Sequence, residues 1–238
     1  MIELTVHNAA DYLRRKGWIG SEPVEVDSLG WGVSNAVLRV RTPNQTFVLK
    51  QSRPQLRTRD AWFSNLDRVY REQEVMQMLG TVLPAPAVPE VLFSDRENFV
   101  FAMSQAPPGA RVWKEILLDC EIDRSVAARA GYILGLMHEA TGRDASLVEP
   151  FRDHTVFVQL RVEPFYDRIV ERHPDLAEHV KPVIVRLVTE KIALCHGDYS
   201  PKNILVHDRG FTLVDYETAH YGDASMDLGF FLSHIILK

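Results

Sequence analysis

The sequence has few cysteines and no block of basic residues. Its two cysteines, Cys120 and Cys195, have neither metal-ligand spacing nor the density of a disulfide framework, so we expect a reduced, cytoplasmic protein without a zinc site. The net charge of −5 is spread along the chain without a basic stripe. This distribution argues against nucleic acid as a partner.

Signals for secretion and membrane insertion are also lacking. Residues 1–10 contain neither the basic nor the apolar segment of a secretory signal. The longest apolar stretch, 228–237, is interrupted by Ser233 and His234 and has about half the length of a membrane span. The sequence therefore predicts a soluble protein with no membrane partner.

The composition that is present, 46% hydrophobic and 25% charged, is typical of a folded protein. The first part favours an antiparallel sheet plus one helix that ends before Gly80. After the Pro-Pro-Gly segment at 107–109 the pattern becomes mainly helical. The predicted strands are 24–29, 36–42, 46–51, 90–93 and 99–103, then 192–195, 204–206 and 211–214; the later helices are 123–140, 155–172 and 175–191.

This change of pattern divides the chain into two unlike lobes. We expect an α+β, two-lobed architecture with a sheet-rich N-lobe at 1–103 and a hinge plus mostly helical C-lobe at 104–238. Ligands bind preferentially where two such units meet, so the predicted site lies in the cleft between them.

The strongest chemical signal is the segment His196-Gly197-Asp198-Tyr199-Ser200-Pro201-Lys202-Asn203. It has the His-x-Asp-x-x-x-x-Asn spacing of a kinase catalytic loop, and Asp215 follows at the end of the next apolar strand. Asp198 is the candidate base for an attacking hydroxyl. Asn203 and Asp215 supply the hard oxygen ligands that Mg²⁺ prefers.

Lys50 ends an apolar strand, where its cation can reach the phosphates of a nucleotide. Both Glu72 and Glu74 lie on the following helix and compete for it, because residues two apart point in different directions. The turn at 29–35 lies between strands, which excludes a dinucleotide-binding or Walker loop. We expect the backbone at Gly30 and Gly32, with donors from Ser34 and Asn35, to bind phosphate.

Two further segments carry weaker signals. The segment from Met103 to Ala106 leaves the fifth strand at the hinge, where its N–H and C=O groups would be unpaired and could bind an adenine edge. Asp223 and Asp227 precede the final apolar segment. Asp227 is a candidate for orienting the catalytic-loop backbone, and Asp223 is an equally good helix N-cap.

Together these motifs resemble the aminoglycoside phosphotransferase and choline-kinase-like family of small-molecule kinases, which has a protein-kinase-like fold. The resemblance runs from about residue 8 to the C-terminus. It implies ATP and Mg²⁺ as cofactors, Asp198 as base and Glu72, rather than Glu74, as the partner of Lys50. It also implies adenine contacts from the backbone of Ser104 and Ala106, metal contacts from Asn203 and Asp215, and loop support from His196 and Asp227.

Departures from the protein-kinase pattern favour a small-molecule acceptor. Asp215 is followed by Tyr216-Glu217 rather than Phe-Gly, and no Ala-Pro-Glu segment follows. Ser200 stands where protein kinases carry a lysine; Lys202 either substitutes for that lysine or is a solvated loop residue. We predict transfer of the γ-phosphate of ATP to a hydroxyl of an aminoglycoside, amino alcohol or sugar-like molecule. A nucleotide-binding pseudoenzyme or regulatory fragment is the alternative, and a kinase acting on protein is a third hypothesis.

The C-terminal end departs from the resembled family, whose members usually continue with helices that build the acceptor pocket. This sequence stops at Lys238, within an apolar helical segment. We therefore expect a C-terminally short lobe with an open acceptor pocket and exposed apolar surface around Phe230, Phe231, Ile235 and Ile236. Self-association through this surface, or marginal stability, is the expected consequence.

Overall fold

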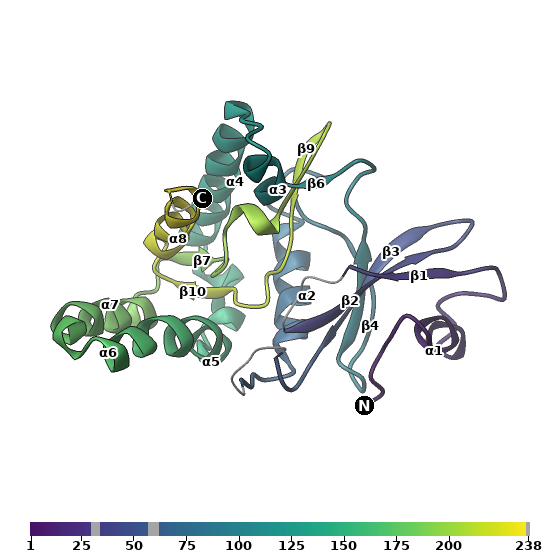
Figure 1. Ribbon diagram of the computed structural model, residues 1–238, viewed down its shortest axis with the longest axis horizontal. Coiled ribbons are helices and arrows are strands. Elements are labelled where there is room, and N and C mark those ends of the chain that lie inside the picture. Colours follow the sequence, from purple (N-terminus) through teal and green to yellow (C-terminus); the bar gives the residue numbers. More distant parts are fainter. Residues whose placement is uncertain (30–33, 57–61, 237–238) are drawn as a thin grey trace.

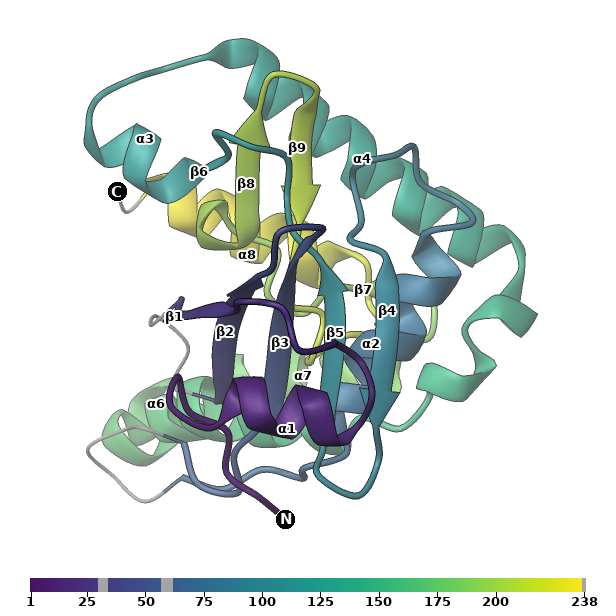
Figure 2. The same cartoon turned by 90° about the vertical axis from the view of Figure 1, so that its right-hand side faces the viewer.

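A five-stranded antiparallel sheet forms the N-terminal half of the protein in the computed structural model, which describes residues 1–29, 34–56 and 62–236 (Figure 1). The strand order is β1-β2-β3-β5-β4. One helix packs on each face, α1 in front and α2 behind in Figure 2. The bounds are α1 Ala9–Arg15, β1 Glu25–Ser28, β2 Asn35–Arg41, β3 Thr46–Ser52, α2 Arg68–Leu79, β4 Val91–Asp95 and β5 Val100–Ser104.

The alternation of strand β3 explains why the sheet needs two covering helices. Phe47 and Leu49 pack into the cluster on the α1 side, whereas Val48 packs with α2. Because successive side chains point to opposite faces, Lys50 shares the α2 face with Val48. Six of the seven β3 residues are buried, as expected for a strand covered on both faces.

Helix α2 carries its single buried acid within its apolar stripe. Val69, Glu72, Met76 and Leu79 follow helical spacing and are all buried. The helix ends at Gly80, which confirms the predicted stop. A carboxylate in such a stripe requires a buried partner, because burying an unpaired charge is costly.

The C-terminal half is mainly helical and is built around helix α4. Ala130, Leu134 and Met137 of this helix are buried, as predicted, but Ala127 at the start of the predicted apolar stripe is exposed. Asp223 caps the last helix by accepting a hydrogen bond from Ser225 N at 2.9 Å. The bounds are β6 Arg111–Val112, α3 Trp113–Leu118, α4 Arg124–Arg143, η1 Ala145–Leu147, η2 Glu149–Phe151, α5 Thr155–Phe157, the π-helical η3 Val158–Asp167, α6 Arg168–Arg172, η4 Pro174–Leu176, α7 Ala177–Thr189, β7 Ala193–Cys195, η5 Pro201–Asn203, β8 Ile204–His207, β9 Gly210–Leu213, β10 His220–Gly222 and α8 Ser225–Ile236.

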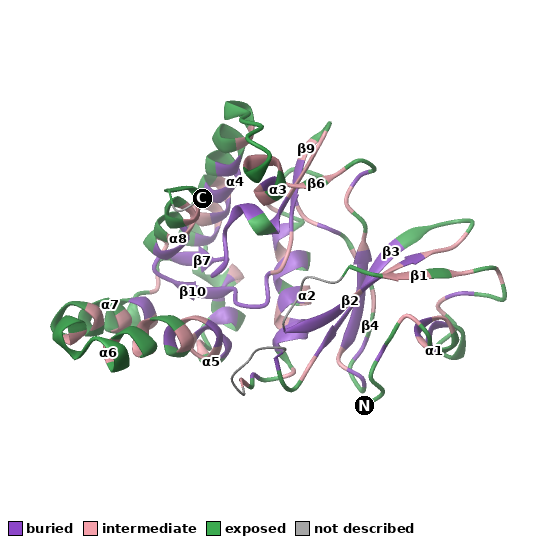
Figure 3. Cartoon of the chain, in the orientation of Figure 1, coloured by how far each residue is buried: buried purple, intermediate pink, exposed green. Residues whose placement is uncertain are grey.

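Burial is concentrated where the two halves meet, and helices α6 and α7 are largely exposed (Figure 3). Helix α8 is exposed along one apolar side, at Leu228, Leu232, Ile235 and Ile236. The predicted exposure is therefore confirmed for Ile235 and Ile236. It is wrong in part for Phe231, which packs on Trp113 and Tyr199, and for Phe230, which packs on the cluster containing Phe157.

Within residues 1–29, 34–56 and 62–236, no helix combines the length and apolar character that crossing a membrane requires.

Candidate active site

The loop after strand β7 is held rigidly by backbone and side-chain contacts. Gly197 has a φ of +76°, and a Cβ there would lie 2.6 Å from the carbonyl oxygen of Thr218, so glycine is required. His196 is fully buried; its Nε2 donates to Val214 O at 3.1 Å and its Nδ1 accepts from Asp198 N at 3.2 Å. Burial lowers the pKa of His196, which keeps the ring neutral and suited to this pattern.

Asp227 supports the same loop from helix α8. Its two carboxylate oxygens accept hydrogen bonds from His196 N at 2.7 Å and Gly197 N at 2.9 Å. His138 Nε2 lies 3.1 Å from one of these oxygens. The contacts expected of His196 and Asp227 as loop supports are therefore present.

Asp198 has one carboxylate oxygen with polar partners and one without. Oδ2 lies 2.9 Å from Arg161 Nη2 and 2.7 Å from Lys202 Nζ, and it accepts a hydrogen bond from Asn203 Nδ2 at 3.0 Å. Oδ1 is buried and has no hydrogen-bond partner within the described part of the chain. A carboxylate fixed through one oxygen in this way leaves the other to accept a proton from a bound hydroxyl.

Lys50 joins the sheet, helix α2 and the loop after β9. Its Nζ lies 2.6 Å from Glu72 Oε2 and 2.6 Å from Asp215 Oδ1. Burial disfavours the charged amine, but Asp215 and Glu72 outweigh this effect and raise the pKa of Lys50. Glu74 instead pairs with Arg96 at 3.6 Å on the surface. The predicted Lys50–Glu72 contact is therefore confirmed.

Asp215 and Asn203 lie next to each other at the end of strand β9. Val214 N donates to Asn203 O at 3.0 Å, and Asp215 has a φ of +71°, a strained conformation for a residue with a side chain. Burial opposes ionisation of Asp215, but Lys50 and Lys202 lower its pKa below the ordinary value. The site thus keeps an ionised carboxylate at neutral pH.

The donor chemistry at this position fits a magnesium ion. Asn203 uses its Nδ2 for Asp198, which leaves its Oδ1 as an oxygen ligand beside the Asp215 carboxylate. Within the residues that the structure describes, no three His, Cys, Asp or Glu side chains converge into an all-protein metal site. Two protein oxygens with open positions suit Mg²⁺, which keeps waters and phosphate oxygens in its coordination shell.

The hairpin expected to bind phosphate is only partly described, because Gly30 and Gly32 lie outside the described residues. Ser34 Oγ donates to Glu217 Oε1 at 2.6 Å, and Asn35 Nδ2 donates to Glu217 Oε2 at 2.8 Å. The expectation that these two side chains offer free donors is therefore wrong for this structure. Their donors are used to join the sheet to the loop that carries Asp215.

Arg68 completes this junction and was missed from the sequence. Its Nε donates to Glu217 Oε2 at 3.0 Å, and its Nη2 donates to Ser34 O at 2.5 Å and Arg53 O at 2.9 Å. Both Arg68 and Glu217 are buried. The position of Glu217, two residues after Asp215, was a sequence signal that could have identified it as part of the site. No local pattern distinguishes Arg68, the first residue of α2, from a solvated helical arginine.

The hinge offers fewer free backbone groups than expected. Ser104 N donates to Glu90 O at 2.8 Å, so the expected free N–H at Ser104 is wrong. Ala106 N makes no hydrogen bond to another described residue. A cavity of about 510 Å³ adjoins this segment. Its lining comprises Arg39, Arg41, Thr46, Pro86, Val88, Pro89, Ser104, Gln105, Ala106, Pro107, Pro108, Arg209 and Thr212.

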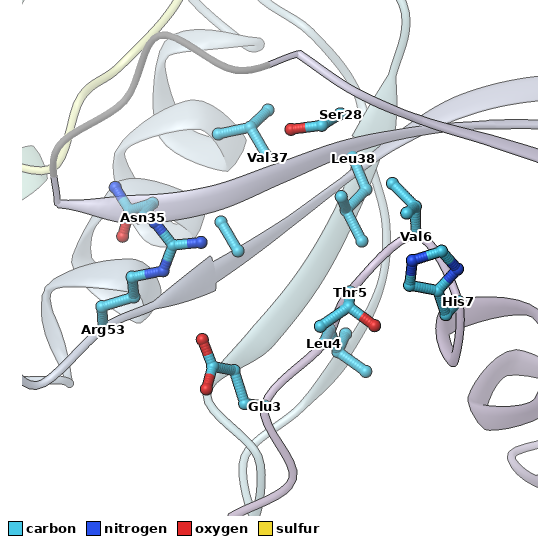
Figure 4. A pocket seen from close by; sticks show the side chains of 11 residues that line it. Glu3, Leu4, Thr5, Val6, His7, Ser28, Asn35, Val37, Leu38 and Arg53 are labelled. Carbon is cyan, nitrogen blue, oxygen red and sulfur yellow. The ribbon is translucent and has the colours of Figure 1, made fainter. Parts of the chain in front are cut away.

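A second cavity, of about 270 Å³, lies between the N-terminal segment and strand β2 (Figure 4). Leu4 and Leu38, which line it, belong to the cluster on the α1 side of the sheet. Val37 points away from Leu38 in the figure and packs on the α2 side, where Lys50 lies.

The geometry and the sequence agree with one family of proteins. The sequence pattern of the phosphotransferase enzyme family (APH) matches residues 25–236. The chain belongs to this phosphotransferase family. This result confirms the resemblance inferred from the motifs.

Curated relatives of this phosphotransferase-family chain include two bacterial methylthioribose kinases. The protein from Exiguobacterium sibiricum is 26% identical and that from Escherichia coli is 25% identical, over 97% and 91% of this chain. The chain spans only 66% and 58% of the length of these two relatives.

Solved structures establish that the phosphotransferase-family chain has a protein-kinase-like fold. A choline/ethanolamine kinase family protein from Mesorhizobium loti superimposes with a TM-score of 0.62 at 19% identity, covering 96% of this chain and 71% of that protein. Spectinomycin phosphotransferase APH(9)-Ia, solved with ADP and spectinomycin, gives a TM-score of 0.61 at 12% identity, covering 96% and 74%. At these identities the likeness concerns the fold alone.

Proposed function

We propose that this protein transfers the γ-phosphate of ATP to a hydroxyl of a small molecule and that it uses Mg²⁺. The observation that carries the proposal is the unpaired Oδ1 of Asp198, in a loop that Asn203 braces and that also adjoins Asp215. Phosphoryl transfer needs positioned charge more than covalent catalysis, and this arrangement supplies it. The family membership supports the same reaction class.

We place the nucleotide between the sheet half, residues 1–103, and the helical half, residues 104–238. Ala106 N is the hinge donor for an adenine edge, with Ser104 contributing its carbonyl. Lys50, held by Glu72, pairs with the phosphates. Asn203 and Asp215 would hold the magnesium ion, which would neutralise charge on the phosphate oxygens.

Asp198 Oδ1 takes the proton of the acceptor hydroxyl as the hydroxyl oxygen bonds to the γ-phosphorus. The bond from that phosphorus to the bridging oxygen breaks, and ADP leaves with its electron pair. Asn203, Arg161 and Lys202 keep Oδ2 fixed, so the carboxylate does not rotate away from the acceptor. Positioning and general-base action of this kind account for large rate effects.

The test is magnesium-dependent phosphorylation of a panel containing methylthioribose, choline and an aminoglycoside, detected by mass spectrometry of the acceptor. Asp198→Asn should lower kcat by about 10²–10⁴-fold with little change in ATP affinity. Asp215→Ala should abolish magnesium-dependent nucleotide binding. Asp208→Asn, at an exposed turn acid, is the control and should change neither quantity.

A loss of tenfold or less in Asp198→Asn would refute the assignment of the base. Magnesium-dependent ATP binding without phosphorylation of any acceptor would instead favour the pseudoenzyme alternative. Unchanged Mg–ATP binding by Asp215→Ala would show that the metal ligands are misassigned.

A further inference from the structure

Arg161 brings a partly buried cation to Asp198 from a part of the chain that no kinase motif identified. Its Nε donates to Gly197 O at 2.8 Å, its Nη1 donates to Leu160 O at 2.7 Å, and its Nη2 lies 2.9 Å from Asp198 Oδ2. Its side chain is 12% exposed, so it lies at the inner edge of the site rather than in bulk solvent. Arg161 therefore contacts both the backbone and the candidate base of the catalytic loop.

The element that carries Arg161 is itself unusual. Residues Val158–Asp167 form a π-helix that contains Pro164. Long π-helical segments are rare, and π-helical turns are frequent at functional sites. The Arg161 guanidinium also lies over the ring of Phe230 on α8, 5.9 Å from its centroid. The π-helix and α8 thus hold the guanidinium from two sides.

The guanidinium of Arg161 has N–H groups that its contacts with other residues do not use. A guanidinium has five N–H groups, and its contacts with Gly197, Leu160 and Asp198 engage at most three of them. At least two N–H groups therefore remain at the edge of the site. They suit the oxygens of an acceptor that already places one hydroxyl against Asp198 Oδ1.

We propose that Arg161 selects the acceptor: it binds a hydroxyl oxygen of a neutral, polyhydroxylated sugar and disfavours acceptors that carry an ammonium group there. This inference rests on the proposed phosphotransferase function and specifies its substrate class.

The charges around Asp198 support this selection. Arg161 and Lys202 both lie within 2.9 Å of Oδ2, so two cations surround one carboxylate. Lys202 is 44% exposed and can turn toward a phosphate, whereas Arg161 is fixed by the carbonyls of Gly197 and Leu160. An acceptor ammonium placed beside this fixed cation would be repelled by it. A neutral hydroxyl experiences no such repulsion and gains a hydrogen bond.

The experiment compares methylthioribose with its 2-amino-2-deoxy analogue, at a pH where the amine is protonated. Binding of each sugar is measured by calorimetry in the presence of magnesium and a non-hydrolysable ATP analogue, and kcat/KM is measured with ATP. The variants are Arg161→Gln, Arg161→Lys and, as a control arginine at an exposed position of the following helix α6, Arg172→Gln. Thermal denaturation checks that each variant is folded.

The parent should prefer the neutral sugar by at least tenfold in both binding and kcat/KM. Arg161→Gln should reduce this preference by about tenfold, mainly through KM, Arg161→Lys should retain most of it, and Arg172→Gln should leave it unchanged. Equal loss toward both sugars in Arg161→Gln would mean that the residue only supports the loop and would overturn the proposal. So would a parent that binds the aminated sugar as well as the neutral one, or that binds the nucleotide but neither sugar. A parent that binds no nucleotide would overturn the proposed function itself.

Discussion

Replacing Asp227 by asparagine should destabilise the fold by removing a buried charge that organises the catalytic loop. The carboxylate accepts hydrogen bonds from the backbone N–H groups of His196 and Gly197 through different oxygens. Asparagine retains one acceptor oxygen and presents an NH₂ group to the other N–H. At least one charge-assisted hydrogen bond is therefore lost, and two buried donors face each other.

The size of the effect follows from these contacts. A hydrogen bond to a charged group contributes about 1.5–3 kcal/mol, so we expect the free energy of unfolding to fall by about 3 kcal/mol once the unpaired donor is included. For a chain of this length, each kcal/mol changes Tm by about 2–4 °C. Asp227→Asn should therefore lower Tm by about 6–12 °C at neutral pH.

The dependence on pH gives a second measure of the same carboxylate. Burial opposes ionisation of Asp227, but the hydrogen bond and charge of His138, with His196, lower its pKa below the ordinary value. The stability from this shift is fully present above the unfolded pKa of about 3.9 and is lost as the pH falls through the lower folded pKa. The parent should thus lose stability below about pH 4 more steeply than Asp227→Asn.

Both effects are measured by thermal denaturation, followed by circular dichroism, from about pH 3 to about pH 7. This range includes the acid region in which Asp227 takes up its proton and the neutral region in which it is ionised. Asp208→Asn at the exposed β8–β9 turn is the control and should change Tm by less than about 2 °C. A similarly small change in Asp227→Asn, or an unchanged acid slope, would refute the role assigned to the carboxylate.

Two further substitutions test other parts of the structure. Arg68→Met leaves Glu217 buried without its cation and should lower the free energy of unfolding, measured by urea denaturation, by about 3–5 kcal/mol. Adding Glu217→Gln should restore part of this loss. A cost of less than about 1 kcal/mol for Arg68→Met would contradict the pairing. Leu232 and Ile235 are 47% and 39% exposed on α8, so the double substitution to glutamine should abolish concentration-dependent association in sedimentation velocity without lowering Tm. A parent that stays monomeric at all concentrations would contradict self-association through α8.

Much of the site could be predicted because its residues lie in short segments with their own geometry. The spacing from His196 to Asn203 places both ends of one loop together. The predicted strand-end position of Lys50 is wrong, because β3 continues to Ser52, and it is the alternation along β3 that directs Lys50 toward α2. The choice of Glu72 over Glu74 came from the family resemblance, and the structure shows Glu72 buried within the apolar stripe of α2. For the loop and for Lys50, local spacing or periodicity determines where the side chain points.

The contacts that the sequence did not predict join segments far apart in the chain. Ser34 and Glu217 are separated by 183 residues, and Arg68 and Glu217 by 149, so only the packing of the sheet against the helical half shows that the hairpin donors are already used. Ser104 illustrates the same limit, because its N–H is taken by Glu90, 14 residues earlier, through a strand pairing whose register the sequence does not specify.

The sequence by itself determined the two-part architecture, most of the order of the strands and helices along the chain, and the identity of the candidate base, cation and metal ligands, because hydrophobic period and motif spacing are local properties. The short elements β6, α3 and β10 were not predicted. Only the tertiary structure decided which oxygen of Asp198 has no partner and that Arg161 contacts the other oxygen. Arg161 reaches the loop from a π-helix 36 residues before Gly197, and a long cationic side chain has no periodic signal to distinguish a buried position from a solvated one. Its partner is selected when the helical segment packs against the catalytic loop.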